Sequence, residues 1–498
     1  MDILPSSHYK NSSIRVEKIG WDDSFQMRQT LAMLKDRHAS GDRWIYVFSA
    51  FKDSLSKEKS AQWNTTDLLI EIAEGISHKD VNTILTLQRL GSLYIKSLEQ
   101  ELVGNDQKTE VLAVFSQEFE YLTLAVEDAI ITNQSPNKEN DYSICYQWNT
   151  FSLMGWWEML VSQLYSRAME KEQGWINTYG EKQNATIETL RTNIAQRAMD
   201  ALKNNGVAFV PGYSGNLEGW LFWRVGRWYS DWTAGNLYAA IRKHYSEENV
   251  AFMLKKLFSL SSADPRKVKD VVHLTHISYK LLLEMIDPAG ADAGFVNRAA
   301  ATPEIFRNNG YMKVYNDSGK ETLIDMAWPE NPLEWIQFIQ SRRVRKLRIH
   351  SYFMNRDGYF AFVTNFLAQA GCSIINDSSD ATNINLMIAT NKKEGIEHEN
   401  TRFDTICSQL QKALKQWEWD EGSEVSVTHN SHSLLFAGWE NINKVWVLAE
   451  ITSILAKARI NLGPVVQTDE PKVIVFWVHE SEEERVVQLL HTELIAKR

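Results

Sequence analysis

Cysteine is scarce in this sequence, because 498 residues contain only Cys145, Cys372 and Cys407. The three lie far apart and form no C-x-x-C pair, which argues against a disulfide framework. The N-terminus, MDILPSSHYKNSS, lacks the basic-then-apolar pattern of a secretion signal. Together these absences fit a reducing compartment and predict a cytoplasmic protein.

Long apolar runs and an excess of positive charge are also missing. No apolar run reaches the roughly 18 residues that span a bilayer, so no membrane segment is expected. Lys and Arg number 53 against 63 Asp and Glu, a net charge of −10, which argues against nucleic acid or an anionic membrane as the main partner. The remaining composition, 44% hydrophobic and 23% charged, is that of a globular protein long enough for two to four domains.

The most informative stretch runs from Gly206 to Ile241. An apolar run, Val207 to Val210, leads into the glycine-containing loop PGYSG at 211–215, and a second loop, GRWYSD at 226–231, opens an apolar helix. The first N–H groups of a helix are unpaired and carry a partial positive charge, so a loop of this kind at a helix start is typical of an anion site. The pattern predicts that the protein handles phosphate or carboxylate groups.

The rest of the chain divides by its periodicity. Strands are expected at 14–19 and 44–48, a helix from residue 66, and mostly amphipathic helices over 79–200. Alternating strands and helices return over 206–330. A strand, a crossover helix and another strand imply a parallel or mixed sheet covered by helices. Residues 79–200 are therefore expected to form a helical insertion in an α/β domain.

The C-terminal third contains a short internal repeat. Residues 331–346 predict a connector helix ending in a solvated basic cluster. Beyond it, strand, helix and strand are expected at 347–354, 358–370 and 384–389, and again at 433–437, 444–459 and 472–478, with a final helix at 481–494. Two β-α-β units with hairpin additions predict a pair of small ferredoxin-like modules.

Six segments carry a family resemblance, and they occur in a fixed order. They are VEKIGWDDS at 16–24, WIYVFSA at 44–50, TDLL at 66–69, Gly212-Tyr213, GRWYSD at 226–231 and SSADPR at 261–266. They resemble, in turn, the V-x-K-x-G-G-T-S, V-V-V-S-A, T-(N/D)-x-L, G-(F/Y), G-R-G-G-S-D and (S/T)-x-D-P-R motifs of the aspartokinase family. The helical insertion and the LSSADP run most resemble the ectoine-cluster type of that family, and the C-terminal repeat is similar to its paired ACT domains.

The resemblance implies a domain plan. Residues 1–330 would form an amino-acid-kinase-like α/β/α sandwich with the helical insertion at 79–200, followed by the connector at 331–346. Residues 347–420 and 421–498 would form two ferredoxin-like βαββαβ ACT modules. ACT sheets imply a homodimer or higher oligomer, and an amino-acid effector near 354–360 and 373–382, where Asn376, Asp377 and Ser378 offer polar groups. A dimer interface without a ligand is the alternative.

The resemblance also implies an activity: an allosteric enzyme of amino-acid biosynthesis that transfers the γ-phosphoryl group of ATP to the side-chain carboxylate of aspartate or a close analogue. Magnesium would arrive with the ATP, because no His/Cys ligand cluster is visible. The implied catalytic residues are Lys18 and Asp231; the substrate-binding residues are Ser49, Glu158, Arg227 and Ser230; the nucleotide-binding residues are Lys18, Gly20, Ser24, Gly212, Asp264 and Arg266. Each also has a plain structural interpretation as a strand, turn, cap or helix-face residue.

Several positions depart from the family pattern. Trp21, Asp22 and Asp23 stand where the opening loop has glycine and its neighbours, and Trp228-Tyr229 replaces the adjacent glycine pair of the second loop. A side chain there would block the close approach of phosphate. The alternative hypothesis is therefore a catalytically degenerate homologue that serves as a binding or regulatory protein, or acts on a different substrate. Nearby tryptophans fit either core packing of a helical lid or a remodelled, aromatic-lined pocket: Trp156, Trp157, Trp220, Trp223 and Trp232.

Overall fold

The protein is described here by a computed structural model. The residues that it describes are 14–20, 27–49, 65–78, 80–132, 142–176, 187–212, 229–245, 249–256, 260–289, 296, 301–316, 318–326, 336–351, 357–379, 382–389, 396–418, 426–439, 446–467 and 472–497. The chain forms two compact units. The first comprises Met1–Ser259, Thr275–Tyr279 and Val296–Ala327, and the second comprises Leu260–Leu274, Lys280–Phe295 and Trp328–Arg498.

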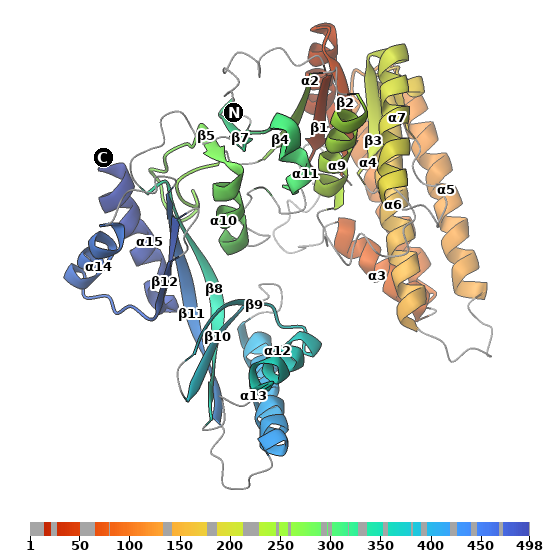
Figure 1. Cartoon of the computed structure of the whole chain (residues 1–498). Coiled ribbons are helices and arrows are strands. Elements are labelled where there is room, and N and C mark those ends of the chain that lie inside the picture. Colours follow the sequence, from red (N-terminus) through yellow and green to blue (C-terminus); the bar gives the residue numbers. More distant parts are fainter. Residues whose placement is uncertain are drawn as a thin grey trace. The chain divides into compact units, whose positions relative to one another are not determined.

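A seven-stranded sheet organises the first unit (Figure 1). Its strands are β1 (Ile14–Ile19), β2 (Arg43–Phe48), β3 (Val207–Pro211), β4 (Val250–Lys255), β5 (His276–Ser278), β6 (Met312–Tyr315) and β7 (Glu321–Asp325). They lie in the order β3-β2-β1-β4-β6-β7-β5, and all neighbours are parallel except β6 and β7. The mixed sheet expected from the alternating strands and helices is confirmed.

The central strands form because their side chains are apolar on both faces. Residues of β2 and β3 are almost all buried, as expected for parallel strands covered by helices on each side. Strand β1 differs, because it also carries Arg15, Lys18 and the fully buried Glu17. Its carboxylate accepts hydrogen bonds from Arg37 and from the Tyr315 hydroxyl, so the buried charge is paired.

Helices surround this sheet and extend away from it. They are α2 (Met27–Ala39), α3 (Thr65–Ser77), α4 (Asn82–Glu101), α5 (Lys108–Thr132), α6 (Tyr142–Ala168), α7 (Ile187–Asn205), α9 (Tyr229–His244) and α11 (Pro303–Phe306), with short 3-10 turns η3 (Glu172–Gly174) and η6 (Arg307–Asn309). Helix α9 packs on β1, β2 and β4, while α6 and α7 pack on β3. Helices α3 to α6 also pack on one another, which confirms the expected helical insertion.

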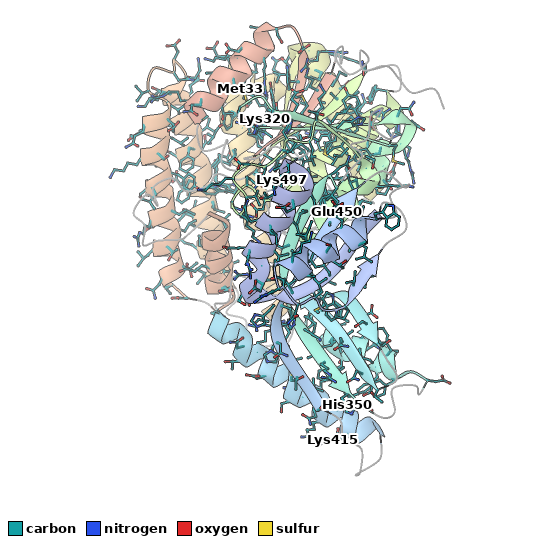
Figure 2. The ribbon with its side chains drawn as sticks, turned by 90° about the vertical axis from the view of Figure 1, so that its left-hand side faces the viewer. Met33, Lys320, His350, Lys415, Glu450 and Lys497 are labelled. Carbon is teal, nitrogen blue, oxygen red and sulfur yellow. The ribbon has the colours of Figure 1, made fainter. Side chains whose placement is uncertain are left out.

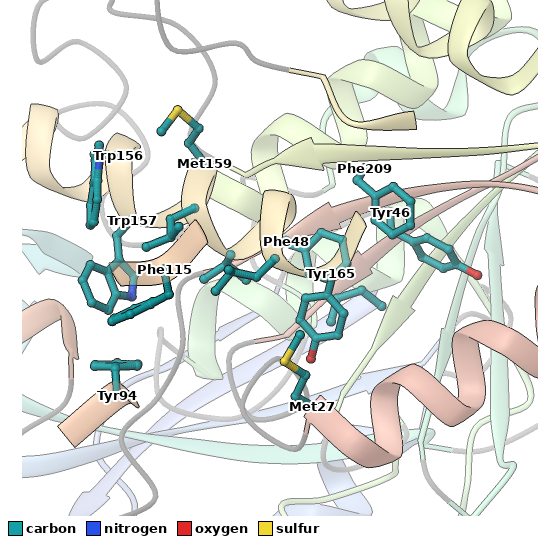
Figure 3. Close-up of a cluster of buried hydrophobic side chains, with 14 of the residues drawn as sticks. Met27, Tyr46, Phe48, Tyr94, Phe115, Trp156, Trp157, Met159, Tyr165 and Phe209 are labelled. Carbon is teal, nitrogen blue, oxygen red and sulfur yellow. The ribbon is translucent and has the colours of Figure 1, made fainter. Parts of the chain in front are cut away.

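An aromatic core joins the insertion to the sheet (Figure 3). Phe48 of β2 stacks on Tyr165 of α6 with ring centroids 4.6 Å apart. Nearer the start of α6, the fully buried Trp157 contacts Tyr94 in an edge-to-face arrangement, with ring centroids 4.6 Å apart. Such pairs add to the apolar area that each ring buries. Trp156, Trp157 and Trp232 are all buried in this cluster, which favours core packing as their role.

The second unit contains a six-stranded antiparallel sheet in the order β12-β13-β11-β8-β10-β9. Its strands are β8 (Phe338–His350), β9 (Ile374–Ser379), β10 (Asn383–Ala389), β11 (Ser426–Trp439), β12 (Val465–Gln467) and β13 (Lys472–His479); its helices are α10 (Tyr279–Ala289), α12 (Tyr359–Gln369), α13 (Ile396–Glu418), α14 (Val447–Lys457) and α15 (Glu483–His491), with η7 (Glu480–Glu482) and η8 (Thr492–Ala496) beside α15. Strand β8 pairs with β11 along its whole length, and both strands run through both halves of the repeat. The two ferredoxin-like modules are therefore joined in one sheet.

The repeat is visible in the buried positions of two helices. Helix α12 buries Tyr359, Val363 and Leu367, and α14 buries Val447, Ile451 and Leu455, each at a spacing of four. That spacing places three side chains on one helix face against the sheet. Figure 2 shows side chains of the second unit, with Lys415 on α13 and Glu450 on α14.

The prediction of a connector helix at 331–346 is wrong for residues 336–346, the part of this segment that the structure describes. Residues from Phe338 onward belong to β8, which pairs with β11 and, from Val344, also with β10. Pairing on both sides satisfies the backbone hydrogen bonds of the strand, and this outweighs the local helical pattern. The basic cluster is not a solvated helix end either, because Arg345 is buried and donates to Ser431 and Asn400.

Candidate active site

Four polar or glycine positions lie where neighbouring parallel strands end. Lys18 is near the end of β1, Ser49 follows β2, Gly212 follows β3, and Lys256 follows β4. These strands are adjacent in the order β3-β2-β1-β4 and parallel, so their carboxyl ends share one edge of the sheet. The carboxyl edge of an α/β sheet is where such folds bind ligands.

A buried carboxylate lies between two buried lysines at this edge. Asp231, in the first turn of α9, is 3.2 Å from Lys18 Nζ through Oδ1 and 3.1 Å from Lys256 Nζ through Oδ2. Their side chains are 0%, 5% and 9% exposed, respectively. One negative and two positive charges leave this trio with a net charge of +1. Two buried ammonium groups beside a helix N-terminus suit an anionic ligand.

The pKa directions follow from this arrangement. Burial alone would raise the pKa of Asp231, but the charges and hydrogen bonds of Lys18 and Lys256 outweigh it, so the pKa lies below its usual value. Burial lowers the pKa of Lys256, and the attraction of Asp231 offsets this only in part. Asp231 therefore stays ionised at neutral pH and holds the two ammonium groups together.

A second group of side chains lies beside the trio, on the β2–β3 side. The Ser49 and Ser230 hydroxyls are 2.8 Å apart and buried. Gly212 donates its N–H to Phe48 O at 2.8 Å, and a Cβ at this glycine would be 2.5 Å from Ser230 Cβ and 2.6 Å from Glu158 Oε2. Glu158 is buried on α6. Only glycine fits here, and its absence of a side chain lets Glu158 and Ser230 approach each other.

The structure thus brings together six of the residues expected from the sequence: Lys18, Ser49, Glu158, Gly212, Ser230 and Asp231. Gly20 directly follows β1 and is half-buried. Lys256 was missed by sequence reasoning. The available signal was its position directly after an apolar strand, because the ends of parallel strands meet at one edge.

The Asp264 and Arg266 pair lies in the second unit. Arg266 donates to both carboxylate oxygens of Asp264, and its backbone N–H donates to Oδ1 at 2.9 Å. Burial opposes ionisation of Asp264, but these hydrogen bonds from Arg266 bring its pKa below the usual value. The pair forms a self-contained turn, and its expected role in nucleotide binding stays a prediction.

Several expected positions lie outside the described residues. They are Ser24 and Arg227, the departures Trp21, Asp22, Asp23 and Trp228, and the tryptophans Trp220 and Trp223. On the expected effector segment, Asp377 is exposed and Ser378 is half-buried on β9, which also carries Asn376. An effector at 354–360 and 373–382 remains a prediction.

A cavity of about 670 Å³ lies elsewhere in the second unit. It is lined by Arg343, His432, His479 and Glu484, among others, and by no residue of the expected effector segments. Among the residues that the structure describes, no group of three His, Cys, Asp or Glu side chains is arranged to hold a metal ion. Within the same described ranges, no helix is both long and apolar enough to cross a membrane.

Comparison with solved structures defines the class of fold. The chain is similar to E. coli aspartokinase III in complex with lysine and aspartate, with a TM-score of 0.64 and 18% identity over 97% of this chain and 100% of that chain. It is similar to the same enzyme with aspartate and ADP, with a TM-score of 0.63 and 19% identity over 96% of this chain and 99% of that chain. It is also similar to Clostridium acetobutylicum aspartate kinase, with a TM-score of 0.65 and 15% identity over 97% of this chain and 99% of that chain.

These likenesses establish that the chain has the aspartokinase fold. No family model and no curated protein matches the sequence.

Proposed function

We propose that the protein is a phosphotransferase that uses ATP to phosphorylate the side-chain carboxylate of aspartate or a close analogue. The observation that carries this proposal is the buried Lys18–Asp231–Lys256 trio at the carboxyl edge of the sheet. Phosphoryl transfer depends mainly on positioning and on neutralising the charge of the transferred group. Two lysines held by one carboxylate supply that charge without moving.

In this proposal the trio binds the phosphates of ATP. An oxygen of the acceptor carboxylate attacks the γ-phosphorus, the bond to the β-phosphate oxygen breaks, and ADP leaves with that electron pair. No proton moves, because the acceptor is an anion. Lys18 and Lys256 stabilise the charge on the transferred oxygens, and Asp231 keeps the ammonium groups in place. Magnesium would arrive bound to the phosphates.

The neighbouring group suits the acceptor. The Ser49 and Ser230 hydroxyls can donate to a carboxylate, and Glu158 can accept from an ammonium group. An amino acid carries both groups. Aspartate is bound in both E. coli aspartokinase III structures of similar fold, together with lysine in one and with ADP in the other. Arg227, Gly20 and Ser24 are proposed to complete the substrate and nucleotide contacts, and Asp264 and Arg266 to contact the nucleotide.

The test is calorimetric titration of ATP with and without magnesium, followed by aspartate-dependent release of ADP. We expect magnesium–ATP to bind and aspartate to stimulate turnover. Replacement Lys256→Met should lower kcat/KM about a hundredfold or more, the usual loss when one donor to a developing charge is removed. The matched control is Lys243→Met on α9, whose exposed ammonium group pairs with Glu188, and it should leave turnover unchanged.

Absence of heat at millimolar magnesium–ATP would reject the kinase proposal. It would favour the alternative, a catalytically degenerate homologue with a binding or regulatory role. Binding of ATP without aspartate-dependent ADP release would point to a different acceptor, and a panel of small carboxylic acids would then identify it.

A further inference from the structure

The cavity of about 670 Å³ in the second unit lies beside a step in the sheet. Strand β13 ends at His479, and β11 pairs with it from His432 to Trp439. Beyond this step β11 continues and pairs with β8 on its other side. Residues 430–432 and 479–481 line the cavity, together with Arg343 and Glu484. The cavity is therefore formed within the second unit, apart from the candidate active site of the first unit.

Two histidines lie side by side at this step. His432 and His479 are directly opposite each other in the antiparallel register of β11 and β13, so their side chains project from the same face of the sheet. Their ring centroids are 6.1 Å apart. A tetrahedral zinc ion with bonds of about 2.0–2.1 Å to two imidazole nitrogens holds the ring centroids about 5–6 Å apart. Small side-chain rotations would therefore bring both rings onto one ion.

The second nitrogen of each ring already has an oxygen partner. His432 Nδ1 lies 3.4 Å from Asn430 O, and His479 Nδ1 lies 2.8 Å from the Ser481 hydroxyl oxygen. A histidine that binds a metal usually donates its other N–H to an oxygen of this kind, which leaves the lone pair on Nε2. The Ser481 N–H also lies 3.3 Å from His479 Nδ1, and it would pass to water once Nδ1 carries the proton.

The charges on the cavity wall favour a cation. Glu480 and Glu484 both line the cavity. Arg343 lines it too, but its Nη1 is 3.0 Å from Glu480 Oε1 and its Nε donates to the buried Glu483 at 3.1 Å, so its charge is offset. The ammonium group of Lys346 lies 5.3 Å from the centroid of a tryptophan ring, which stabilises it there. A cation in the cavity would therefore be attracted by carboxylates whose partners do not cancel them all.

We propose that His432 and His479 bind a divalent transition cation of the zinc type through their Nε2 atoms, with water completing the coordination. Imidazole nitrogen suits zinc, copper and nickel, whereas magnesium and calcium prefer oxygen ligands. The cavity supplies two ligands rather than three, in line with the absence of a larger metal-binding group among the described residues. Two protein ligands are fewer than the four of a closed structural zinc site, so the ion would be loaded reversibly.

An ion at this place would connect two parts of the second unit. β11 runs through both halves of the repeat, and His479 is the last residue of β13 before the turn η7 and helix α15. A ligand that binds the folded state alone stabilises that state by mass action. Occupancy of the site should therefore make the end of β13 and the turn η7 open less often. This consequence is independent of the proposed kinase activity.

The experiment is calorimetric titration of the full-length protein with zinc in a phosphate-free buffer at neutral pH. Loss of an outer partner of a metal ligand usually costs about 10–100-fold in affinity, so His432→Gln and His479→Gln, which remove a ligand, should each raise the Kd at least about a hundredfold. Ser481→Ala keeps both ligands and should raise the Kd about tenfold. Magnesium should not compete with zinc for this site.

The matched control is His429→Gln. His429 is on the same strand, but an odd number of positions from His432 places it on the other face, where its Nε2 lies 2.9 Å from Asp404. This variant should bind zinc as the wild type does. An unchanged circular dichroism spectrum shows that each variant is folded.

Amide hydrogen exchange with and without zinc locates the site. Zinc should slow exchange over 429–432 and 478–482 in the wild type and in His429→Gln, and should leave it unchanged in His432→Gln. Wild-type protein that gives no heat with millimolar zinc would overturn this proposal and leave the kinase proposal standing. Zinc binding that persists undiminished in both His432→Gln and His479→Gln, or that protects other segments only, would overturn it as well.

Discussion

Replacing Asp231 by asparagine should destabilise the first unit more than any surface change. In the wild type, Asp231 is 3.1 and 3.2 Å from the two ammonium nitrogens. At an effective dielectric constant of about 20, each contact is worth about 5 kcal/mol before the cost of removing the charges from water. Breaking a buried pair by deleting one partner usually costs about 3–5 kcal/mol, because the other charge is left without compensation. We expect a loss in this range.

Deprotonation of a lysine sets an upper limit to this loss of stability. A lysine with an ordinary pKa of about 10.4 can escape an uncompensated site by deprotonating, which costs about 4.6 kcal/mol at pH 7. Burial already lowers the pKa of Lys256, and in Asp231→Asn the folded-state pKa of Lys256 should fall further below its unfolded value, because the attraction of the carboxylate is gone. The unfolded state then binds more protons between the two values, so the stability of the variant should rise with pH, by up to about 1.4 kcal/mol per unit between pH 7 and 9.

Native-state hydrogen exchange is the suitable assay, because it reports the opening of β1 and α9 separately from the second unit. Phosphate is omitted from the buffer so that no anion replaces the carboxylate. The matched control is Glu188→Gln, which breaks an exposed pair with Lys243 on α9 and should cost less than about 1 kcal/mol. A loss in Asp231→Asn no larger than that of the control, and independent of pH, would refute the reasoning.

Three further predictions concern other parts of the molecule. Gly212→Ala places a Cβ 2.5 Å from Phe48 O, so it should cost about 1–3 kcal/mol in urea unfolding and weaken aspartate binding. Because the pKa of Glu483 is about 2, the second unit should lose about 2–3 kcal/mol of stability as pH falls from about 4.5 towards 2; circular dichroism of wild type and Glu483→Gln should show this acid loss in the wild type only. Trp157→Ala should lower stability by about 3–5 kcal/mol in thermal unfolding, and Trp157→Phe by less than half of that.

The sequence predicts the strands of the first unit well for a physical reason. Parallel strands such as β2 and β3 are buried on both faces, so their sequences are short continuous apolar runs. Such runs are easy to recognise as strands. The helix prediction for 331–346 was wrong because β8 carries five Lys and Arg residues on a strand that is stabilised by pairing with β11, whose paired residues lie 76 to 100 positions away in sequence. Local periodicity contains no information about that pairing.

The candidate site could be predicted where a polar residue lies at the end of a strand or the start of a helix. It could not be predicted where a residue's role depends on partners far away in sequence. Lys18, Ser49 and Asp231 each end a strand or begin a helix, which is where ligand-binding residues are expected. Lys256 is equally placed, but only the order of strands in the sheet brings it to Asp231. The attachment of the 262–267 segment to the second unit could not be predicted, because Lys267 and Ser262 bond Glu483 and His491, which lie more than two hundred residues further along the chain.

Two consecutive residues of α9 divide the site between them, and this predicts a separable effect on the two substrates. Successive helix positions are turned by about 100°. Ser230 accordingly meets Ser49 on the β2 side, whereas Asp231 meets Lys18 and Lys256 on the β1–β4 side. Under the proposed function, Ser230→Ala should raise the KM for aspartate about tenfold, equal to one lost hydrogen bond to a charged group, with the Kd for magnesium–ATP unchanged. Asp231→Asn should mainly lower kcat and nucleotide affinity. Equal changes in both constants for both variants would contradict this division, because it would mean that the two sides of the helix serve one ligand.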